Sequence, residues 1–254
     1  METIWGSALC DVEKNGVNIA VIGVFGKSSL EYSPTCTLSF KDPVEAVKET
    51  VEVIKSKEEA DMIVCISHSG TNANIKKSED EILAMEVPEL DLIVSGHTHT
   101  LLEEPIVHGN TAIVSCGEYG RYMGNLSMIE VEEGIWQVEN YERIKVDSDV
   151  AQDPEISAQI QAFSEEIDAK YLSQFGYTRD QVLCYNPWKY QTLKQMSADV
   201  QEQPFANLLA DSYLFTLEKL GINSKDETMI SVVPMGVIRD VLPENQEITV
   251  TNVY

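Results

Sequence analysis

The chain has 254 residues, of which 43% are hydrophobic and 24% are charged, a composition typical of a globular protein with a packed core. Its 42 acidic and 18 basic side chains give a formal net charge of -24, which disfavours nucleic acid and anionic membrane surfaces as partners. No stretch approaches the roughly 20 apolar residues of a membrane span. The five cysteines show neither the tight spacing of a thiolate zinc site nor a disulfide framework.

The first part of the chain predicts alternating strands and helices. An aliphatic and β-branched run at residues 17–26 predicts a strand buried on both faces. A helix follows, with Asp42 as N-cap and Pro43 at its first position. Such alternation indicates a layered α/β domain. The further predicted elements are strands at 60–70, 91–99 and 110–120, a short helix with a Ser78–Glu81 capping box, and an antiparallel hairpin around Glu133 and Gly134.

The pattern changes from residue 153 onward. Residues 153–176 predict one long helix, and residues 203–221 predict a second helix with Pro204 near its start and Gly221 as its C-terminal cap. The chain ends within a predicted strand or the turn after it. We therefore expect the second domain to be incomplete.

Three histidines follow two neighbouring predicted strands. His68 follows the apolar run MIVCIS of the strand predicted at 60–70, and His97 and His99 follow the run LIVS of the next strand. In open α/β sheets, ligands bind outside the carboxyl ends of the strands, and imidazole suits zinc, iron, manganese or nickel. Histidines two residues apart can bind one ion or reach two ions about 3.5 to 4 Å apart. Purely structural turn histidines are the alternative, and His108, in a polar turn, is expected to be exposed to solvent.

Several segments carry the motifs of a known family: ISHSG at 66–70, VSGHTHT at 94–100 and VSCGEYGRYMGNLSM at 114–128. They resemble the later motifs of the calcineurin-like metallophosphoesterase domain of bacterial 5′-nucleotidases and UDP-sugar hydrolases. QPFANLLADSYL at 203–214 and VVPMGVIRDVLPENQEITVTNVY at 232–254 are similar to the opening of that family's C-terminal domain.

The resemblance implies an α/β fold with three parts. Residues 1–147 would form the C-terminal part of a layered metallophosphoesterase α/β sandwich, and residues 148–190 a linker helix region. Residues 191–254 would begin an α+β 5′-nucleotidase C-terminal domain, which binds substrate.

The resemblance also implies a site for two divalent metal ions, which would be zinc, manganese, cobalt or magnesium in the parent protein. His68 and His97 would bind one ion, and His99 the other. A metal-bound water or hydroxide would attack phosphorus. The guanidinium of Arg239 would approach the phosphate of a small nucleotide substrate, a role that suits its paired donors.

The sequence departs from the family at the start of the metal site. The family uses an Asp-x-His strand end, a bridging aspartate and an Asn-His-Glu turn that supplies the catalytic histidine, whereas this sequence has no Asp-x-His and no Asn-His dipeptide. We therefore assign no catalytic residue and expect a fragment, inactive alone, of a parent hydrolase with a missing N-terminal fragment. The alternative is a non-catalytic pseudo-enzyme or a metal- or nucleotide-binding remnant. Family members are usually periplasmic or at the cell surface, but no signal peptide is visible, so the location stays unknown.

Overall fold

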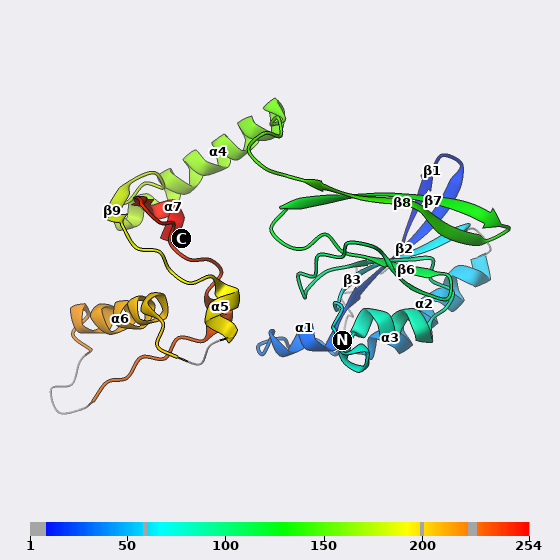
Figure 1. The fold of residues 1–254 in the computed structure, drawn as a ribbon, viewed down its shortest axis with the longest axis horizontal. Coiled ribbons are helices and arrows are strands. Elements are labelled where there is room, and N and C mark those ends of the chain that lie inside the picture. The colour runs from blue at the N-terminus through cyan, green and yellow to red at the C-terminus, as the bar shows by residue number, and fades with distance from the viewer. Residues whose placement is uncertain (1–8, 58–59, 199–200, 223–227, 254) are drawn as a thin grey trace. The chain divides into compact units, whose positions relative to one another are not determined.

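The computed structural model describes residues 9–57, 60–198, 201–222 and 228–253. The chain divides into two compact units, Met1–Ala151 (the first unit) and Gln152–Tyr254 (the second unit), each with its own packing (Figure 1). Among the described residues, none of the helices is long and apolar enough to cross a membrane.

A six-stranded sheet forms the centre of the first unit (Figure 1). Its strands follow the order β1-β2-β3-β4-β6-β5. The inner four strands run parallel, and the edge strands β1 and β5 are antiparallel to their neighbours. The predicted α/β class is therefore confirmed, with a mixed sheet. The strands are β1 Leu9–Lys14, β2 Val17–Phe25, β3 Met62–His68, β4 Leu92–Ser95, β5 Ile106–His108 and β6 Thr111–Val114.

Two helices, α2 (Pro43–Lys57) and α3 (Glu79–Glu86), cover one face of this sheet (Figure 1). The predicted N-cap of α2 is confirmed, because the Asp42 carboxylate accepts a hydrogen bond of 3.0 Å from the backbone N of Val44. Apolar side chains of both helices pack on inward-facing residues of the strands and form the main core. Its largest fully buried members are Ile22, Leu83, Leu90, Ile93 and Ile113.

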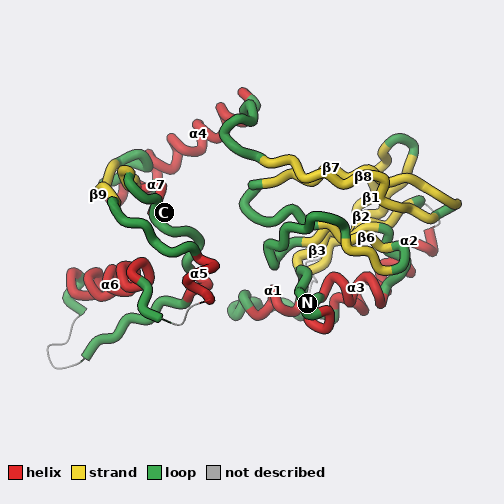
Figure 2. The backbone as a smooth tube through the Cα atoms, in the orientation of Figure 1, coloured by secondary structure: helices red, strands yellow, loops and turns green. Residues whose placement is uncertain are grey.

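The opposite face is only partly covered. The hairpin of β7 (Tyr122–Glu132) and β8 (Ile135–Lys145) packs on β4 and β6, and Figure 2 shows it crossing the sheet. Toward the carboxyl ends of β2 and β3 this face is exposed, and Phe25 and Ile66 are 41% and 55% exposed. The prediction that the strand at 17–26 is buried on both faces is therefore wrong.

The predicted capping box of α3 does not form. Ser78 stands at the N-cap, but its hydroxyl accepts a hydrogen bond from the backbone N of Asn72 instead. Glu81 instead lies 2.8 Å from Nε2 of His108. The expected solvent exposure of His108 is also wrong, because its side chain is only 22% exposed and is paired with this carboxylate.

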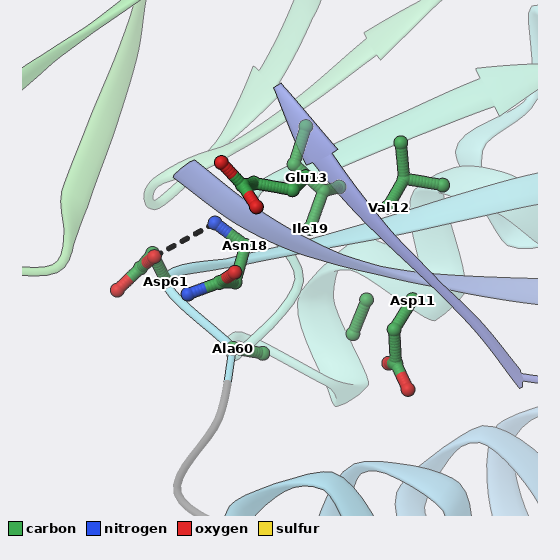
Figure 3. Close-up of a pocket in the computed structure, with 8 residues that line it drawn as sticks. Asp11, Val12, Glu13, Asn18, Ile19, Ala60 and Asp61 are labelled. Atoms are coloured by element: carbon green, nitrogen blue, oxygen red, sulfur yellow. Dashed lines mark hydrogen bonds between the residues drawn. The ribbon is translucent and has the colours of Figure 1, made fainter. Parts of the chain in front are cut away.

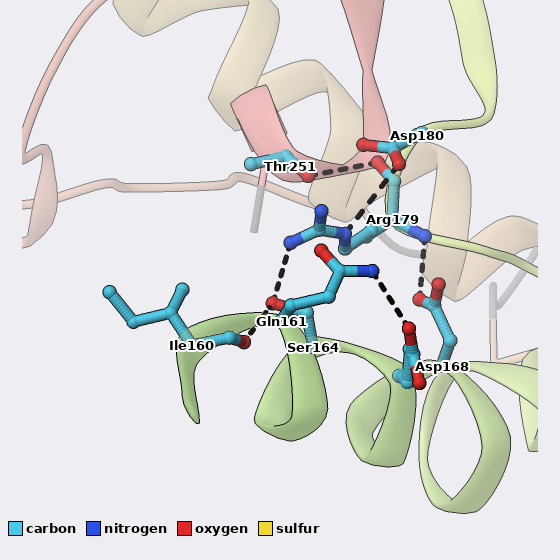
Figure 4. Close-up of polar contacts among 8 residues, drawn as sticks. Ile160, Gln161, Ser164, Asp168, Arg179, Asp180 and Thr251 are labelled. Carbon is cyan, nitrogen blue, oxygen red and sulfur yellow. Dashed lines mark hydrogen bonds and ion pairs between the residues drawn. The ribbon is translucent and has the colours of Figure 1, made fainter. Parts of the chain in front are cut away.

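The second unit contains helices, a two-stranded antiparallel sheet and a small apolar core around Met196, Phe205 and Ile238. Arg179 links two of its helices: its guanidinium donates to the hydroxyl of Ser164, and its carbonyl accepts from Thr251 (Figure 4). The elements are α4 Pro154–Lys170, η2 Leu172–Phe175, β9 Val182–Asn186, α5 Leu193–Ala198, α6 Pro204–Lys219, η3 Met235–Val237, β10 Gln246–Thr249 and α7 Val250–Val253.

Candidate metal centre

Two histidines meet at the carboxyl edge of the central sheet. β3 and β4 are parallel neighbours, and Ser67 pairs in register with Ser95. His68, at the end of β3, and His97, just beyond β4, therefore reach the same edge. Their ring centroids lie 5.0 Å apart. This separation is within the reach of a single metal ion, whose bonds to imidazole nitrogens are about 2 Å long.

The turn after β4 has a left-handed backbone at both of its histidines, with φ of 65° at His97 and 55° at His99. This region is uncommon for residues other than glycine, and such strain is concentrated at functional sites. Gly96 lets the turn approach β3, because a Cβ there would lie 3.2 Å from the carbonyl oxygen of Ser67. The positions of the two imidazoles thus depend on a backbone conformation that is unusual for histidine.

The surroundings of His97 favour the neutral imidazole. Burial lowers the pKa of His97, and the neighbouring His68 lowers it further, while Glu79 acts in the opposite direction. Metal ions bind the neutral form of histidine. The lowered pKa therefore keeps His97 in the form that can bind a metal ion at neutral pH.

His99 is paired with a carboxylate that the sequence did not single out. Its Nδ1 lies 2.7 Å from Oε2 of Glu118, in the turn between β6 and β7. The ring of Tyr119 packs edge-on against His99, with the centroids 5.5 Å apart. A carboxylate that contacts one ring nitrogen in this way orients the other nitrogen of a metal-binding histidine. The glycines that flank this turn, Gly117 and Gly120, were the available signal for its sharp bend.

One buried carboxylate contacts both histidine turns. Asp80, in the first turn of α3, has 0% exposure. It accepts hydrogen bonds from the hydroxyls of Ser67 and Ser95, each 2.5 Å long, and from the backbone N of Gly70 at 3.0 Å. Burial raises the pKa of Asp80, and these hydrogen bonds oppose that rise. In the sequence, Asp80 is one of several acids at a helix start, so nothing there marked it.

Threonine hydroxyls join the same two turns. The backbone N of Thr71 donates to Oγ1 of Thr98 at 3.2 Å, and its hydroxyl donates to Oγ1 of Thr100 at 3.0 Å. Gly70 has φ of 92°, and a Cβ there would lie 2.3 Å from Cγ2 of Thr98. The two turns are therefore in direct contact.

Aromatic rings lie against the histidine pair. Phe25 stacks on His68 with the centroids 5.9 Å apart, and Tyr32 meets His97 edge-on at 5.8 Å. Tyr32 follows α1 (Lys27–Glu31), whose first backbone N–H groups donate to the carboxylate of Glu79. The start of α3 therefore also anchors the segment that brings an aromatic ring to the site.

The donor set is suited to a metal ion but incomplete within the part of the chain that the structure describes. No group of three or more histidine, cysteine, aspartate or glutamate side chains comes close enough there to hold a metal ion. A catalytic zinc ion takes three protein ligands. His68 and His97 therefore fit as part of a ligand set that needs further donors.

Arg239 belongs to the second unit and lies in an exposed segment after η3. The structure thus brings His68 and His97 together and pairs His99 with Glu118. Arg239 lies in the second unit, whereas all three histidines lie in the first unit.

A pocket lies at the opposite end of the sheet, near the amino ends of β2 and β3 (Figure 3). Asp11, Glu13 and Asp61 line it, and Asp61 accepts a hydrogen bond of 2.8 Å from the backbone N of Asn18. The described residues that line it include no histidine. Acidic side chains alone do not identify a site, so the histidine edge remains the candidate.

Comparison with known proteins supports a class for this site. Residues 8–101 match the family model of the Calcineurin-like phosphoesterase, and this segment includes His68, His97 and His99. Over this segment the chain is therefore similar to calcineurin-like phosphoesterases.

Two relatives have names that refer to nucleotides. The chain is 29% identical over 176 residues to the trifunctional nucleotide phosphoesterase protein YfkN of Bacillus subtilis, a match that covers 67% of this chain and 12% of that protein. It is also 29% identical over 160 residues to a 5′-nucleotidase of Vibrio cholerae, covering 53% of this chain and 29% of that protein. The chain therefore spans less than a third of the length of these two relatives.

Solved structures confirm the fold. A 5′-nucleotidase precursor from Thermus thermophilus superposes with a TM-score of 0.73 at 22% identity, covering 97% of this chain and 48% of that chain. A 5′-nucleotidase from Candida albicans gives a TM-score of 0.62 at 17% identity, covering 95% of this chain and 45% of that chain. The mixed α/β fold is thus that of 5′-nucleotidase metallophosphoesterases.

Proposed function

We propose that this chain is part of a metal-dependent phosphoesterase that hydrolyses nucleotide phosphate esters, with 5′-nucleotidase activity as its main reaction. UDP-sugars and 2′,3′-cyclic nucleotides are the other candidate substrates. The observation that carries the proposal is the pair of His68 and His97 at one sheet edge, 5.0 Å apart between ring centroids. Relatives named as a 5′-nucleotidase and a nucleotide phosphoesterase support a nucleotide substrate.

In this proposal His68 and His97 hold one divalent ion, and His99 holds a second. When bound, such ions supply a nucleophilic water at neutral pH and stabilise negative charge on phosphoryl oxygens. Glu118 fixes the ring of His99 through its contact with Nδ1. Arg239 binds the substrate phosphate through the paired donors of its guanidinium.

We also propose that a further N-terminal segment completes the site. The resemblance calls for a bridging carboxylate and a catalytic histidine, and the sequence has neither an Asp-x-His nor an Asn-His dipeptide. Two ions held without a bridging carboxylate would repel each other strongly. The small share of its relatives that the chain spans supports the same proposal. This chain alone is then inactive.

A non-catalytic protein that binds a metal ion or a nucleotide is the second candidate. It is supported by the lack of any three-donor group among the residues that the structure describes. In this case the sheet edge that carries His68 and His97 would bind a metal ion or a nucleotide, and the protein would not hydrolyse a substrate.

Phosphate release from AMP, UDP-glucose and 2′,3′-cyclic AMP, with manganese, zinc or cobalt, tests the proposal. The chain is assayed alone and together with a supplied segment that carries the Asp-x-His and Asn-His-Glu motifs. We expect hydrolysis only from the combination, its loss in His97→Gly, and a raised KM in Arg239→Ala.

Calorimetric titration with the same metals separates the candidates. Metal binding by the chain, lost in His97→Gly, without hydrolysis in the combination would favour the non-catalytic protein. Hydrolysis by the chain alone would contradict the need for a further segment. A chain that binds no metal, alone or in the combination, would contradict the metal centre.

A further inference from the structure

We propose that Asp80 is the positioning residue of the metal centre, because its carboxylate sets the distance between the His68 turn (residues 67–71) and the His97 turn (residues 95–99). The inference rests on the proposed function for the role of the two histidines as metal ligands. The positioning itself rests on contacts within this chain.

The carboxylate acts where the sheet stops. The paired ladder of β3 and β4 ends at Ser67 and Ser95, and beyond this pair the two strands are no longer paired with each other. Oδ1 of Asp80 accepts from the hydroxyl of Ser67, and Oδ2 accepts from the hydroxyl of Ser95. One rigid carboxylate therefore spans the two strands at the point where the histidine turns begin.

The His68 turn is fixed to α3 by a reciprocal pair of hydrogen bonds. The backbone N of Gly70 donates to Oδ2 of Asp80 at 3.0 Å, and the backbone N of Asp80 donates to the carbonyl oxygen of Gly70 at 3.1 Å. The His97 turn then packs on Gly70, because there is no room for a Cβ between Gly70 and Thr98. The positions of both turns therefore depend on Asp80.

The burial of Asp80 argues that this contact has a specific role. A carboxylate without exposure is costly unless hydrogen bonds compensate for its lost hydration. The side-chain hydrogen bonds described above all go to the two histidine turns, and α3 is not capped by them. A residue needed only to begin α3 would not require such burial.

Asp91 offers a matched control. Its carboxylate accepts a hydrogen bond of 2.7 Å from the backbone N of Ile63, at the start of β3. Asp91→Ala therefore removes a carboxylate contact from the same strand, but at the end away from the histidines. If the effect came from lower stability of the fold, both variants would lose metal affinity. If it came from the positions of His68 and His97, only Asp80→Ala would lose it.

The test uses the full chain and two measurements. The nuclear Overhauser effect between the ring protons of His68 and His97 reports their closeness without metal, and calorimetric titration with zinc or manganese reports affinity. We expect Asp80→Ala to lose the ring contact and to weaken metal binding about 10- to 100-fold. Asp91→Ala should retain both, and Asp80→Asn, which keeps an acceptor oxygen, should restore part of the affinity.

An unchanged ring contact in a folded Asp80→Ala chain, or an equal loss in Asp91→Ala, would overturn the inference. Should Asp80→Ala fail to fold, Ser95→Ala takes its place, because it removes only one of the hydroxyl donors to Asp80. An unchanged ring contact in Ser95→Ala would then count against the proposal, and a weakened one would support it. Absence of metal binding by the unsubstituted chain, both alone and in the combination, would contradict the proposed function, while the ring contact would still decide the role of Asp80.

Discussion

Nδ1 of His99 and Oε2 of Glu118 lie 2.7 Å apart, and this contact leaves Nε2 as the imidazole nitrogen available to a ligand. Both side chains are partly exposed, at 44% and 33%, so the pair contributes little to stability. Its effect is to fix the orientation of the ring.

Replacing Glu118 should therefore weaken metal binding more than it weakens the fold. We expect Glu118→Ala to raise the metal dissociation constant about 10- to 100-fold, with little change in the melting temperature. Calorimetric titration and thermal unfolding measure the two effects. Arg121→Ala is the control, because it removes the other partner of Glu118 and leaves His99 paired. Equal affinities in Glu118→Ala and the unsubstituted chain would refute the role of Glu118.

Gly70 should not tolerate a side chain. Alanine there would combine a φ of 92° with a contact of 2.3 Å to Thr98, and should cost at least about 2 kcal/mol of unfolding free energy. Gly23 is the control, because a Cβ there meets nothing within 4 Å. Gly23→Ala should be neutral or stabilise by up to about 1 kcal/mol. Urea unfolding tests both, and a similar stability for the two variants would contradict the tight packing of the turns.

Asp91 should make the protein less stable as the pH rises from about 4 to about 6. Burial raises the pKa of Asp91 from 3.8 to about 6, although the hydrogen bond from Ile63 opposes it. In this interval the folded state binds more protons than the unfolded state, so the stability that is fully present below pH 3.8 is lost progressively as the pH rises through about 6.

Asp91→Asn cannot ionise and should lack this loss. The free energy of unfolding of Asp91→Asn, relative to the unsubstituted chain, should therefore rise between pH 4 and pH 7. Urea unfolding at a series of pH values gives this difference directly. A difference that stays constant across the interval would show that Asp91 titrates normally in the folded state.

The cysteines should differ sharply in reactivity. Burial raises the pKa of Cys65 to about 12, so its thiolate, the reactive form, is scarce as well as inaccessible. Cys36 and Cys184 are free and exposed. We expect iodoacetamide to label Cys36 and Cys184 in the native chain and Cys65 only after unfolding, as mapped by peptide mass spectrometry. Native labelling of Cys65 at the rate of Cys36 would contradict its burial.

The long elements could be predicted because their signals are local. The N-cap at Asp42 and the apolar period behind it identified α2, and the turn at Glu133 and Gly134 identified the β7–β8 hairpin. Short strands were missed, since β1, β5 and β9 depend on pairing with other segments. The exposure of Phe25 was missed for a related reason, because an apolar run does not reveal which face of a strand lacks a covering layer.

The candidate site shows the same division. The histidines stand out in the sequence because their residue type and their place after apolar strands are local facts. Asp80 and Glu118 do not, because their roles arise from burial and from partners distant in the sequence. The predicted capping box at Ser78 does not form, because the hydroxyl of Ser78 accepts a hydrogen bond from the backbone N of Asn72.

The left-handed backbone at His97 also determines how its chemistry can be separated from its conformation. Alanine at this position would remove the imidazole and add a conformational penalty of roughly 1–2 kcal/mol, whereas glycine would remove the imidazole and accept φ of 65° freely. The stability difference between His97→Ala and His97→Gly thus measures the energy stored in the turn. The loss of metal affinity that the two variants share measures the contribution of the His97 imidazole to metal binding.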